Sequence, residues 1–308
     1  MYQGLKLYCG SSIPELAHKI ARRLDTEIGD IDVRRFPDGE VDVRLNETVR
    51  QSDVYLMQSM SYNANDHLME VLLMADACKR ASAGRVTAVV PYLAYSRQDR
   101  LMSPRVPISA KVVAKMLTAV GIDRIVSVDI HAGQIQGFYD MPFDHLRAGK
   151  LLIAHLRKSG LEDIIVVSPD AGGVHLGSRF AHGLGSAMAL IDRRGVKAKS
   201  MHLIGDVREK HCIIVDDMVD TGGTLCEAAD LLVTSGARSV RATVTHGVLS
   251  GSAVDRINRS KLAELICTDT VPLPTEKRIE KITVVSVEEL LANTIQHIHE
   301  GRSISPLF

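Results

Sequence analysis

The feature that most constrains the fold of this 308-residue chain is a regular alternation of two kinds of segment. Short runs rich in valine and isoleucine alternate with longer stretches that have the period of an amphipathic helix. Short continuous apolar runs are typical of strands buried on both faces, as in parallel sheets. The pattern predicts strands over residues 5–8, 54–58, 86–91, 125–129, 164–168, 187–191, 212–216, 240–245, 264–267 and 282–285. It predicts helices over residues 14–24, 67–81, 109–120, 146–158, 224–235 and 287–299.

The alternation occurs in both halves of the chain. The predicted fold class is therefore α/β, with two domains that each hold a mainly parallel sheet flanked by helices. The length also favours two domains, since a single domain usually has about 150 residues. A boundary fits the aromatic, turn-rich stretch before residue 146, which gives domains over 1–145 and 146–308.

The charge balance limits what the chain can bind. Lys and Arg together number 37, as do Asp and Glu, so no overall basic field would attract nucleic acid or an acidic membrane, and we expect neither partner. No apolar run is long enough to span a membrane, and the first residues lack the layout of a signal peptide, so a cytoplasmic protein is expected. The five cysteines are scattered, which argues against disulfides and against a zinc site.

The strongest chemical signal is the segment CIIVDDMVDTGGT at residues 212–224. Its apolar strand leads into Asp216 and Asp217, which can accept hydrogen bonds from ribose hydroxyls or hold a hydrated Mg²⁺. A glycine-containing loop before a helix presents backbone N–H groups and the positive end of the helix dipole, so we expect it to bind a phosphate. The alternative is a helix-capping loop with solvated acids. The loop residues expected to hold the phosphate are Asp220, Thr221, Gly222, Gly223 and Thr224.

Three other positions carry chemistry that the residues alone leave open. Phe36 lies in the turn RRFPDGE and could stack on a purine, but the segment also fits an ordinary hairpin turn. Arg97 can clamp phosphates with its planar fork, and the alternative is a surface charge cluster. His131 follows a predicted strand, where a lone histidine is more often a hydrogen-bonded structural group.

The 212–224 segment resembles the phosphoribosyl-diphosphate loop of type I phosphoribosyltransferases and of ribose-phosphate pyrophosphokinases. Other motifs separate these families, because they resemble the pyrophosphokinases in the family's own order. These motifs are NDHLME at 65–70, PYLAYSRQDR at 91–100, VDIHAGQIQGF at 128–138, VSPDAGG at 167–173 and SISPL at 303–307. The resemblance covers essentially the whole chain and implies two similar phosphoribosyltransferase-like domains. It also implies that about 15 residues at the C-terminus pack back on the first domain.

The resemblance implies a Mg²⁺-dependent transferase of nucleotide biosynthesis. It would move the diphosphoryl group of ATP to the anomeric hydroxyl of ribose 5-phosphate, giving 5-phosphoribosyl 1-diphosphate and AMP. It would be a homo-oligomer, expected to be a hexamer built from dimers, in which the 34–40 turn meets ATP bound by a neighbouring subunit. The implied metal ligands are His131 and Asp170. The implied ATP-binding residues are Phe36, Asp38, Gly39, Glu40, Arg97 and Gln98.

The chain departs from the family pattern where the resemblance places catalysis. Family members carry Ile-Asp-Lys-Arg-Arg after a strand, whereas this chain has LIDRRG at 190–195, followed by a shorter loop. Arg193 stands at the lysine position and, with Arg194, is expected to stabilise the transferred group; the alternative is a solvated basic loop. Arginine keeps the charge but replaces a point cation by a planar fork. Residues 101–108 also carry fewer charges than the segment that reads ADP and phosphate in regulated members.

Two other functions share some of these features. A catalytically weak, synthetase-associated regulatory subunit would explain the altered loop, but would have less reason to retain His131, Asp170 and an intact 212–224 segment. A phosphoribosyltransferase would share the phosphate loop but would not need the RQD and DIHAGQIQGF motifs. The prediction that all of these residues favour is the diphosphoryl transfer itself.

Overall fold

The structure is a computed structural model that describes residues 2–193 and 201–307, without the side chain of Arg193. The chain divides into two compact units. The first comprises Met1–Arg147, Thr270–Pro272 and Val287–Phe308, and the second comprises Ala148–Asp269 and Leu273–Ser286. None of the helices in the described ranges is both long and apolar enough to cross a membrane.

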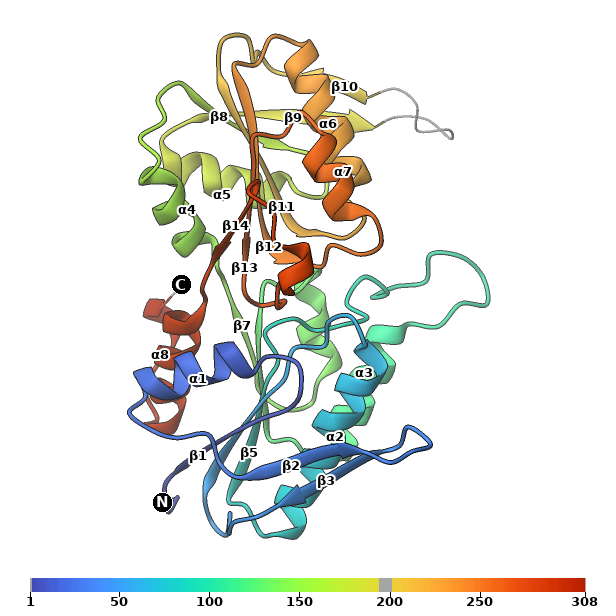
Figure 1. The fold of residues 1–308 in the computed structure, drawn as a ribbon, viewed down its shortest axis with the longest axis vertical. Coiled ribbons are helices and arrows are strands. Elements are labelled where there is room, and N and C mark those ends of the chain that lie inside the picture. The colour runs from blue at the N-terminus through green and yellow to red at the C-terminus, as the bar shows by residue number, and fades with distance from the viewer. Residues whose placement is uncertain (1, 194–200, 308) are drawn as a thin grey trace. The chain divides into compact units, whose positions relative to one another are not determined.

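The first unit is built on a five-stranded sheet whose neighbouring strands are all parallel. In spatial order these strands are β1 (Leu5–Cys9), β4 (Asp53–Met57), β5 (Arg85–Val89), β6 (Arg124–Val128) and β7 (Phe143–Leu146). Its helices are α1 (Pro14–Arg23), α2 (Ala64–Arg80), α3 (Ser109–Ala119), α8 (Glu288–His299) and the 3₁₀ turns η1 (Gly133–Phe138) and η3 (Ser305–Leu307). Figure 1 shows α1 and α8 on one face of this sheet and α2 and α3 on the other. A separate antiparallel hairpin is formed by β2 (Ile31–Arg35) and β3 (Val41–Leu45).

The second unit is built on a seven-stranded sheet. In spatial order its strands are β10 (Met201–Ile204), β9 (Ala187–Arg193), β8 (Ile164–Ser168), β11 (His211–Val219), β12 (Ser239–Gly247), β13 (Glu264–Thr268) and β14 (Ile282–Val285). The edge strand β10 is antiparallel to β9, and the other neighbours are parallel. Its helices are α4 (Gly149–Arg157), α5 (Val174–Leu184), α6 (Gly223–Thr234), α7 (Ala253–Arg259) and the 3₁₀ turn η2 (Thr275–Lys277). Helices α4 and α5 cover one face, and α6 and α7 cover the other (Figure 1).

The strand order of the second unit reverses between β8 and β11. From β8 the chain passes through α5 to β9 on one side, and it later returns to β11 on the other side of β8. In open parallel sheets, ligands bind outside the carboxyl ends of the strands at such a point, because the two following loops diverge. The strand order therefore predicts a ligand site at the loops after β8 and β11.

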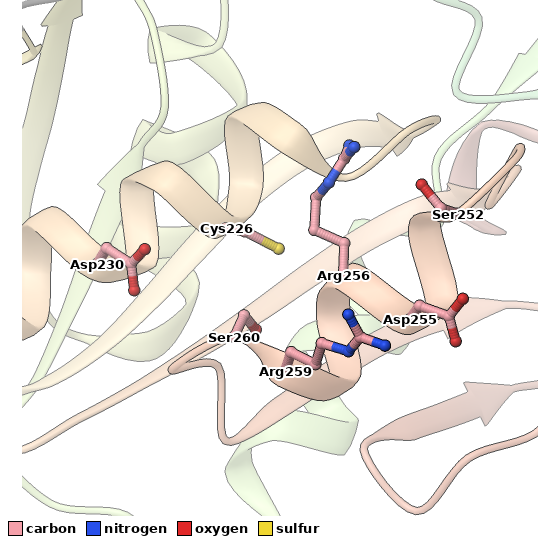
Figure 2. A pocket seen from close by; sticks show the side chains of 7 residues that line it. All are labelled: Cys226, Asp230, Ser252, Asp255, Arg256, Arg259 and Ser260. Carbon is pink, nitrogen blue, oxygen red and sulfur yellow. The ribbon is translucent and has the colours of Figure 1, made fainter.

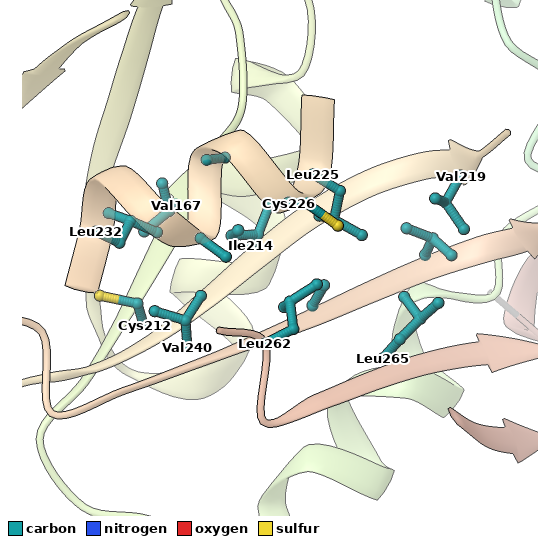
Figure 3. Close-up of a cluster of buried hydrophobic side chains, with 14 of the residues drawn as sticks. Val167, Cys212, Ile214, Val219, Leu225, Cys226, Leu232, Val240, Leu262 and Leu265 are labelled. Atoms are coloured by element: carbon teal, nitrogen blue, oxygen red, sulfur yellow. The ribbon is translucent and has the colours of Figure 1, made fainter. Parts of the chain in front are cut away.

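The core of the second unit holds these loops in place. Figure 3 shows a cluster of buried apolar side chains in which Leu225 and Leu232 of α6 lie against Ile214 of β11 and Val240 of β12. These side chains are almost fully buried, and burying a leucine contributes about 1.5–3 kcal/mol. The cluster thus fixes the start of α6 relative to the end of β11.

All strands and helices expected from the apolar pattern are present, but some ends and elements differ. The prediction of a helix from residue 146 is wrong, because residues 143–146 form β7 and α4 begins at Gly149. In β7 the imidazole of His145 accepts a hydrogen bond from the N–H of Ile130 at 3.0 Å, a tertiary contact that local periodicity does not reveal. Elements that the pattern did not predict are β2, β3, β7, β10, α5 and α7.

A buried ionic cluster attaches the C-terminal helix to the first unit. Asp53 at the start of β4 is 0% exposed, and its carboxylate accepts hydrogen bonds from Arg85 at 2.7 and 2.5 Å and from the Tyr55 hydroxyl at 2.9 Å. Nδ1 of His299 in α8 lies 2.8 Å from the same carboxylate. Arg85 also donates to the carbonyl oxygen of Ile298 at 3.1 Å. The cluster therefore links β4, β5 and the end of α8.

Arg85→Met should destabilise the protein strongly, because it leaves the buried Asp53 carboxylate without its main counter-charge. Breaking a buried pair in this way costs about 3 kcal/mol, which lowers the unfolding temperature by about 6–12 °C in a unit of this size. The control is Arg80→Met, since Arg80 is 79% exposed and pairs with Asp76 on the surface of α2. Calorimetry of both variants checks the prediction, and equal shifts would contradict it.

Candidate functional site

The acidic pair of the 212–224 segment lies inside the last part of β11. The strand was expected to end at residue 216, but it continues to Val219 and pairs with β12 as far as Gly247. Asp216 and Asp217 are half-buried there, and the N–H of Asp217 donates to the Asp216 carboxylate at 2.9 Å. Both acids therefore stand at the carboxyl end of the central strand, beside the point where the strand order reverses.

The phosphate loop, residues 220–223, follows directly and leads into α6. Gly222 has φ +71°, the left-handed region that side-chain-bearing residues rarely adopt, and it precedes the first residue of the helix. The first turn of α6 contains no acidic residue. The N–H groups at this helix start and the helix dipole together favour an anion at the loop.

The electrostatics around Asp216 favour a bound cation or sugar hydroxyls over water alone. Burial, followed by the negative charge of Asp217 and to a lesser extent that of Asp170, raises the pKa of Asp216 to about 8. A carboxyl with close neighbours of like charge ionises more readily when a cation neutralises the group. The arrangement is thus suited to a partner that offers positive charge or hydrogen-bond donors.

Asp170 lies in the exposed loop between β8 and α5. Its carboxylate accepts a hydrogen bond from the N–H of Gly173 at 3.0 Å, and its carbonyl oxygen accepts one from the Ser168 hydroxyl at 2.8 Å. Within residues 2–193 and 201–307, no group of three or more His, Cys, Asp or Glu side chains is arranged to hold a metal ion. A single carboxylate such as that of Asp170 is compatible with Mg²⁺, which usually takes one or two carboxylates and completes its shell with water and substrate phosphates.

The structure adds one residue that the sequence analysis did not single out. Arg256 of α7 donates a hydrogen bond from Nη1 to the carbonyl oxygen of Thr221 at 2.6 Å. The two residues are 35 positions apart, and no motif marks Arg256 in the sequence. Only the packing of α7 beside α6 brings it to the phosphate loop.

The residues expected to bind ATP lie on two segments of the first unit. Phe36, Asp38, Gly39 and Glu40 form the exposed tip of the β2–β3 hairpin, which confirms the hairpin turn itself. The tip is closed by a hydrogen bond from the N–H of Phe36 to the carbonyl oxygen of Glu40 at 2.8 Å, and the Phe36 side chain is 50% exposed. An exposed aromatic ring at a rigid tip is available to a ligand or to another chain.

Arg97 and Gln98 lie exposed in the loop between β5 and α3. Gln98 is held at the start of α3, where its side-chain oxygen accepts a hydrogen bond from the Ser109 hydroxyl at 2.6 Å and its carbonyl oxygen accepts the Ala110 N–H at 3.2 Å. The neighbouring Asp99 accepts a hydrogen bond from Gln134 of η1 at 2.6 Å. The loop is thus fixed at its base while the Arg97 side chain reaches solvent.

The remaining expected residues lie in different parts of the chain. His131 is exposed in the loop after β6, in the first unit, whereas Asp170 belongs to the second unit. Arg193 is the last residue of β9, and its backbone pairs with Met201 of β10. Arg194 lies outside the described residues, so the catalytic assignment of Arg193 and Arg194 stays a prediction.

Comparison with known families finds two matches. A model described as the N-terminal domain of ribose phosphate pyrophosphokinase matches residues 5–121. A model described as the phosphoribosyl synthetase-associated domain matches residues 182–308. The two matches fall at opposite ends of the chain and agree with each other.

Individual relatives match over the full length. The chain is 47% identical to ribose-phosphate pyrophosphokinase 1 of Streptococcus pyogenes serotype M1, covering 100% of this chain and 98% of the relative. It is 49% identical to the ribose-phosphate pyrophosphokinase of Chromobacterium violaceum, covering 100% and 95%. Among solved structures, it is similar to a phosphoribosylpyrophosphate synthetase from Mycobacterium smegmatis, with a TM-score of 0.93, 44% identity, and coverage of 97% of this chain and 100% of that one.

Asp216→Asn should stabilise the protein more at pH 9 than at pH 5. Between the ordinary carboxyl pKa of 3.8 and about 8, the unfolded chain has released a proton that the folded chain retains, so the group makes stability fall as pH rises. Asparagine removes this loss, and we expect an unfolding temperature about 2–4 °C higher than wild type at pH 9. Asp206→Asn is the control, because Arg208 lowers the pKa of the exposed Asp206 and its charge is unchanged over this range. A shift that is the same at both pH values for Asp216→Asn would contradict the assignment.

Proposed function

Because this chain belongs to the ribose-phosphate pyrophosphokinase family, we propose that it transfers the diphosphoryl group of ATP to the anomeric hydroxyl of ribose 5-phosphate, releasing AMP. The observation that carries this proposal on the chain itself is the end of β11 in the second unit, where an acidic pair lies within the strand and the phosphate loop follows it. The relatives that match over the full length are named as the enzyme, and nothing in them favours a regulatory subunit.

Ribose 5-phosphate would lie along the end of β11 in one orientation. Its 5-phosphate would accept hydrogen bonds from the N–H groups of the phosphate loop and from the hydroxyls of Thr221 and Thr224. Its ring hydroxyls would donate to Asp216 and Asp217, a few residues back along the same strand. The sugar is then held at both ends, which fixes the direction in which the anomeric hydroxyl faces.

The carboxylates at the end of β11 suit Mg²⁺ because burial and, after it, the negative charge of Asp217 raise the pKa of Asp216, and a cation would offset both. We assign the metal contacts to Asp170 and His131, with water and substrate oxygens completing the shell. When bound, the ion supplies positive charge to the diphosphate that moves. Asp170 is prepared for this, since its hydrogen bond from Gly173 fixes the direction of one carboxylate oxygen.

ATP would contact Phe36, Asp38 and Glu40 at the hairpin tip and Arg97 and Gln98 in the loop after β5. The ring of Phe36 offers a stacking surface, and the acids offer acceptors to amino hydrogens of a purine. Arg97 offers a planar fork to phosphate oxygens. The hairpin tip is exposed, so we propose that it serves the adenine of a neighbouring subunit in a homo-oligomer.

The chemistry requires alignment and charge rather than covalent help. The anomeric oxygen attacks the β-phosphorus of ATP and its hydroxyl proton is released to solvent. The bond from that phosphorus to the oxygen shared with the α-phosphorus breaks, and AMP leaves with the electron pair. Residues that hold the two substrates in line remove much of the entropic barrier. Arg193 and Arg194 are proposed to stabilise negative charge that develops on the transferred group.

The direct test is to incubate the pure protein with Mg-ATP and ribose 5-phosphate. We expect equal amounts of AMP and a ribose carrying the diphosphate on carbon 1, detected by ³¹P NMR and chromatography. Wild-type protein that binds both ligands yet forms no AMP under saturating Mg²⁺ would instead support a regulatory subunit.

Asp220→Ala and Thr224→Ala should each weaken ribose 5-phosphate binding by about tenfold or more, because Thr224 offers a hydroxyl to the charged phosphate and Asp220 belongs to the loop whose backbone N–H groups are proposed to bind it. ATP affinity should change by less than about threefold, since ATP is bound elsewhere. Isothermal titration calorimetry with each ligand separately measures both effects. Asp230→Ala is the matched control, because Asp230 lies on α6 outside the loop. Equal losses for the two ligands would argue against this assignment.

Arg193→Ala should reduce kcat by about a hundredfold or more while the KM values for both substrates change little. An interaction made only in the transition state has this signature, and the size is typical of losing one such donor. Arg193→Lys should retain or improve the rate, since it restores the residue of the resembling family. Arg22→Ala, an exposed arginine of α1, is the control. Full activity of Arg193→Ala would remove the residue from catalysis.

A further inference from the structure

The carbonyl groups of the phosphate loop are held by a second layer of the protein. The carbonyl oxygen of Val219 accepts a hydrogen bond from the N–H of Leu249 at 3.1 Å, and that of Asp220 accepts one from the N–H of Ser250 at 3.0 Å. The next carbonyl, that of Thr221, is held by the side chain of Arg256 at 2.6 Å. The backbone after β12 thus holds two successive peptide groups, and a guanidinium holds the third.

The third peptide group, between Thr221 and Gly222, supplies one of the N–H groups of the proposed phosphate site. In a trans peptide the C=O and the following N–H point in opposite directions, so holding the Thr221 carbonyl at Arg256 turns the Gly222 N–H to the opposite side. Among the backbone–backbone hydrogen bonds of the described loops and turns, none is donated by the N–H groups of Thr221, Gly222 or Gly223. Gly222 is buried and has the left-handed φ of +71°, a backbone conformation that glycine adopts without steric cost.

We propose that Arg256 is a positioning residue, which orients the Thr221–Gly222 peptide group so that its N–H faces the 5-phosphate of ribose 5-phosphate. This inference rests on the proposed function of the loop. Arg256 acts through the backbone and does not itself touch substrate. A charged donor makes a stronger hydrogen bond to a carbonyl than a neutral one, which suits a group that must hold one peptide orientation of the loop.

The surroundings of Arg256 favour this role. Figure 2 shows its side chain extending from α7 toward the start of α6, at one side of an open pocket of about 400 Å³. A Cβ added to Gly223 would lie 3.3 Å from Nη1 of Arg256, so the glycine leaves room for the guanidinium. Arg259 lines the same pocket one turn later in α7. Within the described residues, the hydrogen bond to the phosphate loop comes from Arg256 and not from Arg259. Arg259 therefore offers a control with the same charge and nearly the same location.

The test compares Arg256→Met, Arg256→Lys and Arg259→Met. Methionine retains a long apolar chain but cannot donate, and lysine restores a single charged donor. For Arg256→Met we expect the dissociation constant and the KM of ribose 5-phosphate to rise by about tenfold, while kcat and the KM of ATP change by less than about threefold. Arg256→Lys should recover part of the loss, and Arg259→Met should match wild type.

The readouts separate positioning from a general structural effect and from failure of the proposed function. Calorimetric binding of ribose 5-phosphate alone does not depend on turnover, so it tests Arg256 even if wild type makes no product. The proposal is overturned if Arg256→Met binds ribose 5-phosphate as wild type does. It is also overturned if the affinities for ribose 5-phosphate and ATP fall together, or if Arg259→Met shows the same loss. If Arg256→Met does not fold, Arg256→Lys and Arg256→Leu are compared in the same way, and wild-type affinity in Arg256→Leu, which cannot donate a hydrogen bond, overturns the proposal.

Discussion

The constraint on which the rest of the structure depends is the parallel pairing of buried strands. Parallel strands need long crossovers, and these place helices on both faces and bring all carboxyl ends to one edge of the sheet. In the second unit the crossovers diverge between β8 and β11, so the loops that carry Asp170 and residues 220–223 meet at one crevice. A single topological feature therefore selects which of the many loops can hold a substrate.

Burial of carboxylates has opposite outcomes in the two units, and the neighbours decide which. Asp53 is fully buried, but Arg85, Tyr55 and His299 surround it with donors, so it serves as a structural anchor. Asp216 instead has Asp217 and Asp170 as its electrostatic neighbours, and its pKa rises. A buried carboxyl beside other carboxylates is stabilised in its ionised form by a bound cation or by hydrogen-bond donors. This is the expected behaviour of a site for a sugar and a cation.

The phosphate loop shows how a short motif depends on distant parts of the same unit. Its glycines permit the backbone conformation, but hydrogen bonds from Leu249, Ser250 and Arg256 determine which way successive peptide groups face. The apolar cluster beneath α6 then fixes the position of the helix start. Local sequence supplies the freedom of the loop, and tertiary contacts remove it.

The sequence by itself determined the α/β alternation, the phosphate loop and the acidic pair, because each depends on short-range periodicity or on residues adjacent in the chain. Only the tertiary structure decided that 143–146 is a strand and that β11 extends to Val219. It alone brought Arg256 to Thr221 and the charge of Asp170 to Asp216. The reason is physical: these features arise from contacts between residues far apart in the chain, and a local pattern of apolar and polar residues carries no information about which distant groups will meet.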